Sequence, residues 1–393
     1  MTRLPRWAAW SPDGAEAPWT VGIEEEVMLL DPGTWALAPR IDEVLPALPE
    51  PLAQRAAAET HGSAIEIASR PHRTVAGAAG ELQHLRGLLS GDLAGLGLRG
   101  AVAGTHPFAQ WTDSIVSAGA RYQSIYETMR ELARREPTFA LHVHVAVPTA
   151  EAATDALRGM RAHLPVLLAL SANSPFWQGR DTGLASARTP IFSTFPRTGL
   201  PRPYASYADY VEAIDVLVRC EAIPEPTFLW WDARLQPRLG TLEVRVMDAQ
   251  TRAWDTAALA ALVQCVVRLE ATEGFAGPRR SEAWEALDEN RFLASRDGVR
   301  AQLIDVDRDR RRPVTDILDE LLAACAPHAR DLGCEAELAG VRAIVAHPGD
   351  ERQRERAAVA PGRQVGDALG IVVEAIAAEF TAGRPDHAPL QHA

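Results

Sequence analysis

Two kinds of hydrophobic pattern alternate along the chain. Alanine- and leucine-rich stretches repeat apolar residues about every three or four positions, which predicts amphipathic helices. Short runs between them alternate β-branched with polar residues, which predicts strands with one apolar face. The predicted strands span residues 20–30, 63–69, 98–104, 139–147, 227–232 and 241–246, and the predicted helices span 74–96, 150–172, 204–218, 256–271 and 281–294. From about Pro313 to Thr381 we expect only helix.

The order of these elements predicts an α+β fold. The strands gather in the first two thirds of the chain and are mostly separated by helices or long loops. Parallel strands that are buried on both faces form continuous apolar runs, so alternation with charge favours an antiparallel or mixed sheet. The 393 residues could hold two or three domains of ordinary size, or one large domain with a helical appendage.

Four of the predicted strands carry charged or titratable side chains on one face. Alternate residues of a strand share a face, so "GIEEEVM" places Glu24 and Glu26 together while Glu25 points to the apolar side. We expect an arginine partner or a strand irregularity to accommodate Glu25. The other three strands follow the same pattern, with Glu66 in "AIEIAS", His142 and His144 in "LHVHVAV", and Glu243 and Arg245 in "TLEVRVMD".

These charged faces indicate a polar cleft. For one strand alone, exposure to water would explain such a face about equally well. Four strands that carry only carboxylate, imidazole and guanidinium groups are harder to explain in that way, and a hydrophobic core cannot hold unpaired charges. Several carboxylates with a histidine bind hard divalent cations, and the oxygen-rich ligand set favours Mg²⁺ or Mn²⁺ over zinc.

All 40 basic residues of the chain are arginine. A GC-rich genome is the simplest explanation, but the absence of lysine also excludes a P-loop lysine and a lysine Schiff base. Divalent cations and arginine together suit phosphoryl chemistry, because both bind phosphate oxygens. For any single arginine a surface ion pair is the simpler role. The arginines nearest the motifs are Arg180, Arg188, Arg234, Arg238 and Arg245.

Net charge and apolar content narrow the choice of partners. A net charge of −12 disfavours general binding to nucleic acid. No apolar run approaches the ~18 residues of a membrane helix, and the first residues lack the apolar segment of a signal peptide, so we expect a cytoplasmic protein. The cysteines form no CxxC pair and are expected to be buried thiols without a catalytic role; they are Cys220, Cys265, Cys325 and Cys334.

Six segments resemble the glutamate–cysteine ligase type 2 family of carboxylate–amine ligases. In chain order they are "TVGIEEEVMLLDP", "AGTHPFAQW", "LHVHVAVP", "ALSANSPFWQGRDTGLASART", "PRLGTLEVRVMDAQT" and "ENRFLASRDG". The resemblance implies a glutamine synthetase-like fold, in which a curved, mainly antiparallel sheet flanked by helices forms a funnel for ATP and metal. It implies a lead segment at residues 1–19 and one ligase domain over 20–381 that is helical from about residue 281. The polar composition of residues 382–393 predicts a disordered tail.

The resemblance also implies roles for individual residues. Mg²⁺, or alternatively Mn²⁺, would be held by Glu24, Glu26, Glu59, Glu66, His142 and Glu243. ATP would contact His144, Arg188 and Arg238, whereas the transferred phosphate or a substrate carboxylate would contact Arg245, Arg234 and Arg180. The roles of His142 and His144 could be exchanged.

The expected reaction joins a carboxylate to an amine through an acyl phosphate and releases ADP and phosphate. By analogy with the family, the substrates would be the γ-carboxylate of glutamate and the amine of cysteine, and the protein could form a homodimer. Four positions depart from the family pattern and leave the substrates open: Ala140 and Ala146 replace glycine, and Leu184 and Asp297 replace tyrosine.

Two other functions remain open at this point. A metal-dependent hydrolase could use the His-x-His pair, with His106 in "GTHP" as the one further histidine expected near the site. A nucleotide-binding descendant of the ligases that has lost catalysis is the other alternative. Release of ADP would separate a ligase from a hydrolase, and amine-dependent turnover would separate it from a binding protein.

Overall fold

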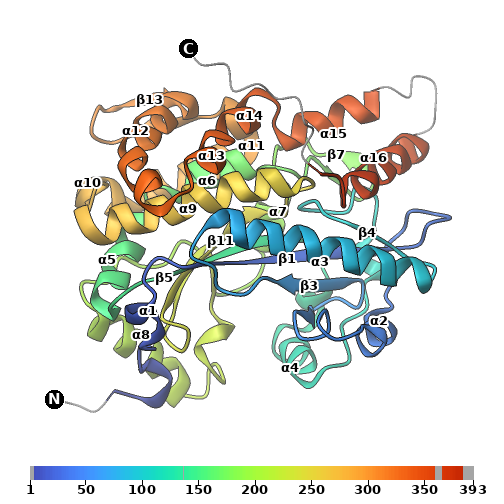
Figure 1. The fold of residues 1–393 in the computed structure, drawn as a ribbon, viewed down its shortest axis with the longest axis horizontal. Helices are drawn as coiled ribbons and strands as arrows, with labels where there is room; N and C mark the ends of the chain where they lie inside the picture. Colours follow the sequence, from blue (N-terminus) through green and yellow to red (C-terminus); the bar gives the residue numbers. More distant parts are fainter. Residues whose placement is uncertain (1–3, 136, 359–364, 384–393) are drawn as a thin grey trace.

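A seven-stranded sheet forms the centre of the computed structural model, which describes residues 4–135, 137–358 and 365–383 (Figure 1). The strand order is β10-β11-β5-β1-β3-β2, with β4 also paired to β1, and every pairing in this sheet is antiparallel. The strands are β1 (Val21–Leu30), β2 (Ala56–Ala58), β3 (Ala64–Ala68), β4 (Arg99–Ala101), β5 (Ala140–Ala146), β10 (Ala233–Gln236) and β11 (Thr241–Asp248). This sheet confirms the predicted α+β fold.

The register of the sheet brings the charged faces together. Glu24 on β1 lies opposite His142 on β5, and Glu26 lies opposite Glu66 on β3. Glu243 on β11 lies opposite His144 in the same way. Directly opposed residues point to the same side of a sheet, so the polar residues of four strands share one face.

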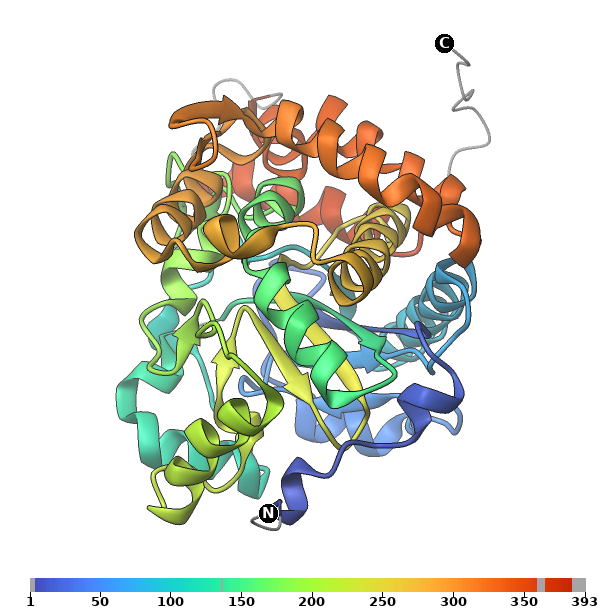
Figure 2. The same cartoon turned by 90° about the vertical axis from the view of Figure 1, so that its left-hand side faces the viewer.

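The opposite face of the sheet is apolar and covered by helices. Ile23, Val143 and Val244 on that face are fully buried. The helices α3 (Val75–Gly95) and α9 (Ala253–Glu273) pack on the strands. The C-terminal helices are α12 (Val314–Leu332), α13 (Glu335–Ala339), α14 (Val341–Ala346), α15 (Gly349–Ala358) and α16 (Val365–Glu379). Of these, α12, α13 and α14 pack on α9, whereas α16 packs on β4 and on α15 (Figures 1 and 2).

Glu25 is the carboxylate of β1 that points into this apolar layer. Its two oxygens accept hydrogen bonds from Arg86 of α3, at 2.7 Å from Nε and 2.5 Å from Nη2. Both side chains are fully buried, and the remaining Arg86 donors bind the carbonyl oxygens of Gln250, Thr251 and Phe380. The predicted arginine partner is therefore confirmed, and it ties β1 to two distant parts of the chain.

The remaining elements surround the sheet. The helices are α1 (Asp13–Glu16), α2 (Ile41–Ala47), α4 (Ala120–Met129), α5 (Ala150–Met160), α6 (Leu164–Ser171), α7 (Arg188–Phe192), α8 (Tyr207–Arg219), α10 (Gly277–Glu282) and α11 (Trp284–Asp297). Three short strand pairs are β6 (Phe176–Trp177) with β7 (Arg180–Asp181), β8 (Thr198–Gly199) with β9 (Trp230–Trp231), and β12 (Gln302–Asp305) with β13 (Arg310–Pro313).

Several predicted elements are wrong in detail. The helix expected at 150–172 is divided into α5 and α6, with Pro165 in the first turn of α6, where a missing N–H costs little. The strand expected at 227–232 begins as a 3₁₀-helix at Pro226–Phe228 and is reduced to β9. The region expected to be helical from about residue 281 also contains the strands β12 and β13. After Pro313 the described residues are helical as expected, in several helices, the first of which ends where Gly333 adopts the left-handed conformation.

Two of the predicted segments extend into residues that the structure does not describe. Residues 359–364 of the expected helical segment and 384–393 of the expected tail are not described.

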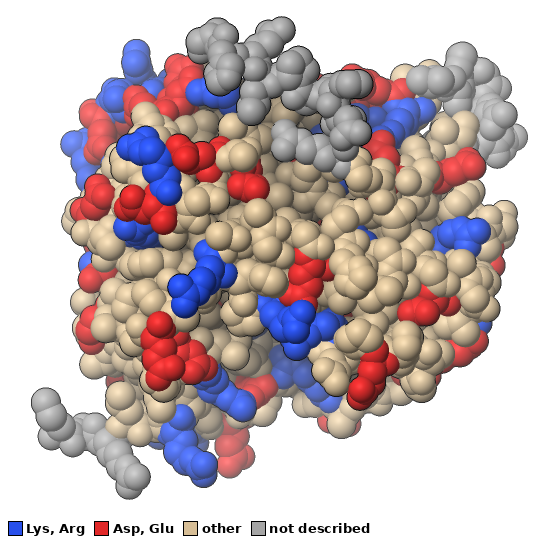
Figure 3. Space-filling view, viewed as in Figure 1, with Lys and Arg blue, Asp and Glu red and all other residues tan. Residues whose placement is uncertain are grey.

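Cys220 is exposed rather than buried, whereas the other three cysteines are buried. Among the described helices, none combines the length and the apolar character needed to cross a membrane. Arginine and acidic side chains are interspersed on the face seen in Figure 3.

Candidate active site

The polar face of the sheet forms one wall of a cavity of about 400 Å³. Helices α4 and α7 and the segment before β9 supply the other walls. Of the residues predicted from the sequence, this cavity is lined by Glu24, Glu26, Glu59, Glu66, His142, His144, Arg188, Arg234, Arg238, Glu243 and Arg245. The remaining one, Arg180, is exposed on the β6–β7 hairpin and lies outside the lining.

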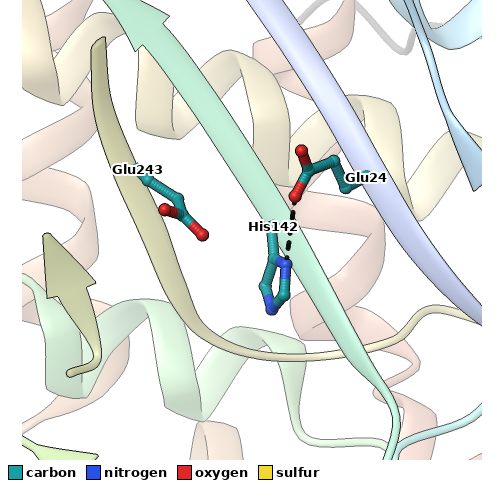
Figure 4. Close-up of side chains that lie close together, drawn as sticks. All are labelled: Glu24, His142 and Glu243. Atoms are coloured by element: carbon teal, nitrogen blue, oxygen red, sulfur yellow. Dashed lines mark hydrogen bonds and ion pairs between the residues drawn. The ribbon is translucent and has the colours of Figure 1, made fainter. Parts of the chain in front are cut away.

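Two groups of possible metal ligands meet at His142. Figure 4 shows the first group, in which β1, β5 and β11 direct Glu24, His142 and Glu243 toward one another. The second group consists of Glu26, Glu66 and the same His142. Within each group the ligand atoms lie within 4.8 Å of one another. Glu59 lines the same cavity but belongs to neither group of described residues.

The histidine at the centre has the properties of a neutral ligand. Burial and the positive charge of Arg245 lower the pKa of His142 to about 4. Its Nδ1 atom lies 3.3 Å from Glu24 Oε2, and its Nε2 atom is buried without a hydrogen-bond partner among the described residues. A neutral imidazole with a free ring nitrogen, surrounded by carboxylates, fits a divalent cation. His144 belongs to neither group, which favours His142 as the ligand.

The carboxylates divide into two kinds. Burial would raise the pKa of Glu24, but the charge of His144 and hydrogen bonds from both histidines hold it below its ordinary value. Against burial, Arg234 and Arg245 likewise hold the pKa of Glu243 well below its ordinary value.

In the second group the shifts have the opposite sign. Burial and the charge of Glu59 raise the pKa of Glu26 to about 8, and burial and neighbouring carboxylates raise the pKa of Glu66. Crowded carboxylates of this kind would be relieved by a bound cation. The donor set therefore fits metal on both sides of His142.

Arginine side chains surround the carboxylate of Glu243. Arg234 donates from Nε to Glu243 Oε2 at 2.7 Å and from Nη2 to Oε1 at 3.2 Å, and Arg245 Nη1 contacts the same Oε1 atom. Arg245 Nη1 also lies 3.3 Å from His142 Nδ1, while its Nε is buried without a partner in the described part of the chain. Arg238 is exposed where it lines the cavity. These guanidinium groups could bind phosphate oxygens beside the ligand clusters.

Sequence reasoning missed several residues of the cavity. Gln236 donates from Nε2 to Glu243 Oε2 at 2.7 Å, and it shares a face of β10 with Arg234. This alternation was visible in "ARLQ", but β10 was not among the predicted strands. Arg121 and Tyr122 of α4 also line the cavity, and no motif marked them.

The histidine expected near the site is not the one found there. His106 is buried with Nε2 bound to the Trp35 carbonyl oxygen at 2.8 Å, outside the cavity lining. His61 lines the cavity instead, with Nε2 3.0 Å from the Ala133 carbonyl oxygen. The four departures from the family pattern also lie outside the lining formed by described residues; they are Ala140, Ala146, Leu184 and Asp297.

Comparisons with known proteins agree on one family. The family model described as "Glutamate-cysteine ligase family 2" matches residues 20–374. A Rubrobacter xylanophilus protein named "Putative glutamate--cysteine ligase 2-1" is 44% identical over 340 residues, which are 86% of this chain and 90% of that protein. A Sorangium cellulosum protein named "Putative glutamate--cysteine ligase 2" is 38% identical over 88% of this chain and 92% of its own length.

Solved structures show the same fold at low sequence identity. The glutamate–cysteine ligase of Francisella tularensis in complex with AMP has a TM-score of 0.65 and 14% identity, with 93% of this chain and 90% of that chain covered. The bifunctional glutathione synthetase of Pasteurella multocida has a TM-score of 0.69 and 11% identity, with coverage of 92% of this chain and 52% of that chain.

Proposed function

Because the chain belongs to the glutamate–cysteine ligase family 2, we propose that it is an ATP-dependent ligase that joins a carboxylate to an amine. The observation that carries the proposal is the pairing of two ligand clusters at His142 with arginines that have unpaired donors in the same cavity. The carboxylate clusters suit Mg²⁺ or Mn²⁺, and the guanidinium groups suit the phosphates of ATP.

The proposed reaction has two steps. An oxygen of the substrate carboxylate attacks the γ-phosphorus of ATP, and the bond to the bridging oxygen breaks to release ADP. The amine nitrogen then attacks the acyl carbon, loses a proton and displaces inorganic phosphate. Glutamate and cysteine are the first substrates to test, since the relatives are named as glutamate–cysteine ligases.

The residues of the cavity have separate tasks in this reaction. Glu24, Glu26, Glu66, His142 and Glu243, with Glu59 beside them, would hold the divalent cations, which offset the repulsion between phosphate and carboxylate. Arg245 and Arg234 would bind the transferring phosphate, and Arg238, an exposed residue of the lining, would contact the polyphosphate. His144, whose Nε2 lies 3.3 Å from Glu24 Oε1, would contact the nucleotide. The role predicted for Arg180 is not carried forward, because the residue lies outside the lining.

A hydrolase is the weaker alternative. Such sites usually combine several histidines or aspartates around one cation. Here one histidine serves both clusters and the other ligands are glutamates, with arginines directly against them. The cytoplasmic location and the homodimer stay predictions.

The test is a screen of pairs of amino acids for Mg²⁺-dependent release of ADP, followed by detection of the amide product by mass. We expect ADP release that requires both an acid and an amine. Consumption of an amide substrate without any ADP release would favour the hydrolase. Nucleotide binding with no turnover for any pair would favour the non-catalytic alternative.

A further inference from the structure

Strand β11 is irregular at the arginine that is proposed to bind the transferring phosphate. Val244 pairs with Val143 and Met247 pairs with Leu141, so Arg245 and Val246 together occupy the space opposite one residue of β5. This two-against-one arrangement is a β-bulge, which re-aims side chains and leaves backbone groups without partners in the ladder.

The bulge also changes which face Asp248 occupies. In a regular strand Glu243, Arg245 and Met247 would share the polar face, and Asp248 would point into the apolar layer. The extra residue reverses the alternation beyond it. Asp248 therefore lies opposite Ala140, on the face that carries the active site, and Met247 is fully buried on the apolar face.

Arg188, the first residue of α7, binds the backbone of the bulge. Its Nη1 donates to the Val246 carbonyl oxygen at 3.3 Å and its Nη2 donates to the Arg245 carbonyl oxygen at 3.4 Å. On the other side of β11, the carbonyl oxygen of Asp232 accepts the Arg245 N–H at 2.7 Å, which continues the pairing of Val244 with Ala233 of β10. The two hydrogen bonds from Arg188 give partners to carbonyl oxygens at the bulge, and a buried carbonyl oxygen without a partner is costly.

Asp248 in turn holds the loop that carries Arg188. Its carboxylate is fully buried and accepts hydrogen bonds from Asn173 N at 2.9 Å, Ser174 Oγ at 2.6 Å and Ser186 Oγ at 2.9 Å. Ser174 Oγ also accepts the Arg188 N–H at 3.2 Å. Asp248 lies outside the lining of the cavity, and this network links it to Arg188, which lies in the lining.

We infer that Arg188 and Asp248 are positioning residues that fix the bulge and thereby direct the Arg245 guanidinium into the cavity. The inference rests on the role proposed for Arg245. It gives Arg188 a different task from the nucleotide contact expected from the sequence. The competing role for Arg188 is direct contact with substrate through its Nε, which is buried and unpaired among the described residues.

The first experiment measures the bulge itself, independently of any activity. Asp248→Asn keeps the size of the side chain but replaces one acceptor oxygen with an NH₂ group, which is itself a donor and cannot accept the hydrogen bonds that Asp248 accepts. The bulge should then open more often, so hydrogen–deuterium exchange of the amides in 241–248 should accelerate at least about tenfold. Arg188→Gln should do the same. Ser186→Ala is the milder variant if Asp248→Asn does not fold, because it removes one of the three hydrogen bonds to Asp248, together with longer contacts of Ser186 Oγ to Ser174 and Thr189.

Asp255→Asn is the matched control, because Asp255 is another buried aspartate, paired with Arg352 at 2.8 Å and outside the cavity. It should leave exchange in 241–248 unchanged. Wild-type exchange in this strand for both Arg188→Gln and the Asp248 or Ser186 variant would overturn the inference, whether or not the protein is a ligase.

The second experiment is a double-mutant cycle on ADP release. Arg188→Gln should lower kcat about ten- to a hundredfold, the effect expected when hydrogen bonds from a charged group are lost, with little change in KM for ATP. If Arg188 acts through Arg245, the double variant should be no slower than Arg245→Gln alone. Effects that multiply would show that Arg188 acts on the substrate directly and would overturn the inference. If the wild type releases no ADP with any substrate pair, the proposed function fails, and the exchange experiment alone decides this question.

Discussion

Replacing Arg245 with lysine tests whether the guanidinium, and not only its charge, serves the reaction. In the structure Arg245 contacts Glu243 and His142 through one terminal nitrogen and keeps Nε unpaired, so several donors can turn to phosphate oxygens. Lysine offers a compact charge that cannot bind two phosphate oxygens in one plane.

The size of the effect can be estimated from comparable sites. Loss of one preorganised donor to a transition state costs roughly 2.7–4 kcal/mol, so Arg245→Lys should lower kcat about a hundredfold or more. Stability should fall by only about 1 kcal/mol, since Glu243 keeps its bonds from Arg234 and Gln236.

The assay is steady-state ADP release, with thermal melting as the test of folding. Arg219→Lys is the matched control, because Arg219 is exposed, pairs with Glu212 and Asp215, and does not line the cavity. The control should retain full turnover. Near-wild-type turnover for a folded Arg245→Lys protein would refute the assigned role of Arg245 and weaken the interpretation of β11.

Three further predictions follow from the same contacts. Glu26→Gln should abolish ADP release without loss of stability, and unchanged turnover at low Mg²⁺ would contradict the metal assignment. The raised pKa of Glu26 means that the metal-free protein loses stability as pH rises from about 4.5 to about 8, so the melting temperature of this variant should depend less on pH in that range. Arg86→Ala should cost about 3–5 kcal/mol in denaturant unfolding, because it leaves Glu25 charged, buried and unpaired; a cost below ~1 kcal/mol would show that the pair does not hold β1. Replacing all four cysteines (Cys220, Cys265, Cys325 and Cys334) by alanine or serine should leave specific activity per folded molecule unchanged, although replacing the buried ones can lower stability. Inactivity of a well-folded variant would show that a thiol has a catalytic role.

The sequence could predict the polar face of the sheet, because strand alternation is a local property. Glu24, Glu26, His142 and Glu243 were placed on the correct faces from a period of two alone, and all of them line the cavity. The register that opposes Glu24 with His142 depends on pairing between distant segments and was not predicted; the family resemblance implied only that both residues hold metal.

Proximity in sequence to a motif was a poor guide to position in space. Arg180 and His106 lie within segments that resemble the family, yet neither lines the cavity: Arg180 lies in a surface hairpin and His106 is buried elsewhere. Conversely, Gln236 and Tyr122 reach the cavity from segments with no motif. An arginine partner for Glu25 was expected, but its identity as Arg86 follows only from the packing of α3 on β1.

The β-bulge in β11 leaves only a small trace in the sequence. "TLEVRVMD" alternates as far as Arg245, but Val246 and Met247 are then two adjacent apolar residues, which breaks the period of two. This local pattern alone does not separate a bulge from the end of a strand. The pairing with β5 identifies the bulge, because two residues then oppose one, and it places Asp248 on the active-site face.

Transfer of oxygen from the carboxylate substrate to phosphate tests the central claim most directly. The acid found in the screen, glutamate first, would be labelled with ¹⁸O in the reacting carboxylate and incubated with ATP, Mg²⁺ and the amine. If the carboxylate attacks the γ-phosphorus, each inorganic phosphate released should carry one labelled oxygen, and the amide should keep the other. Phosphate that contains no label from the acid would show that water or another nucleophile attacks ATP, and would contradict the proposed acyl phosphate.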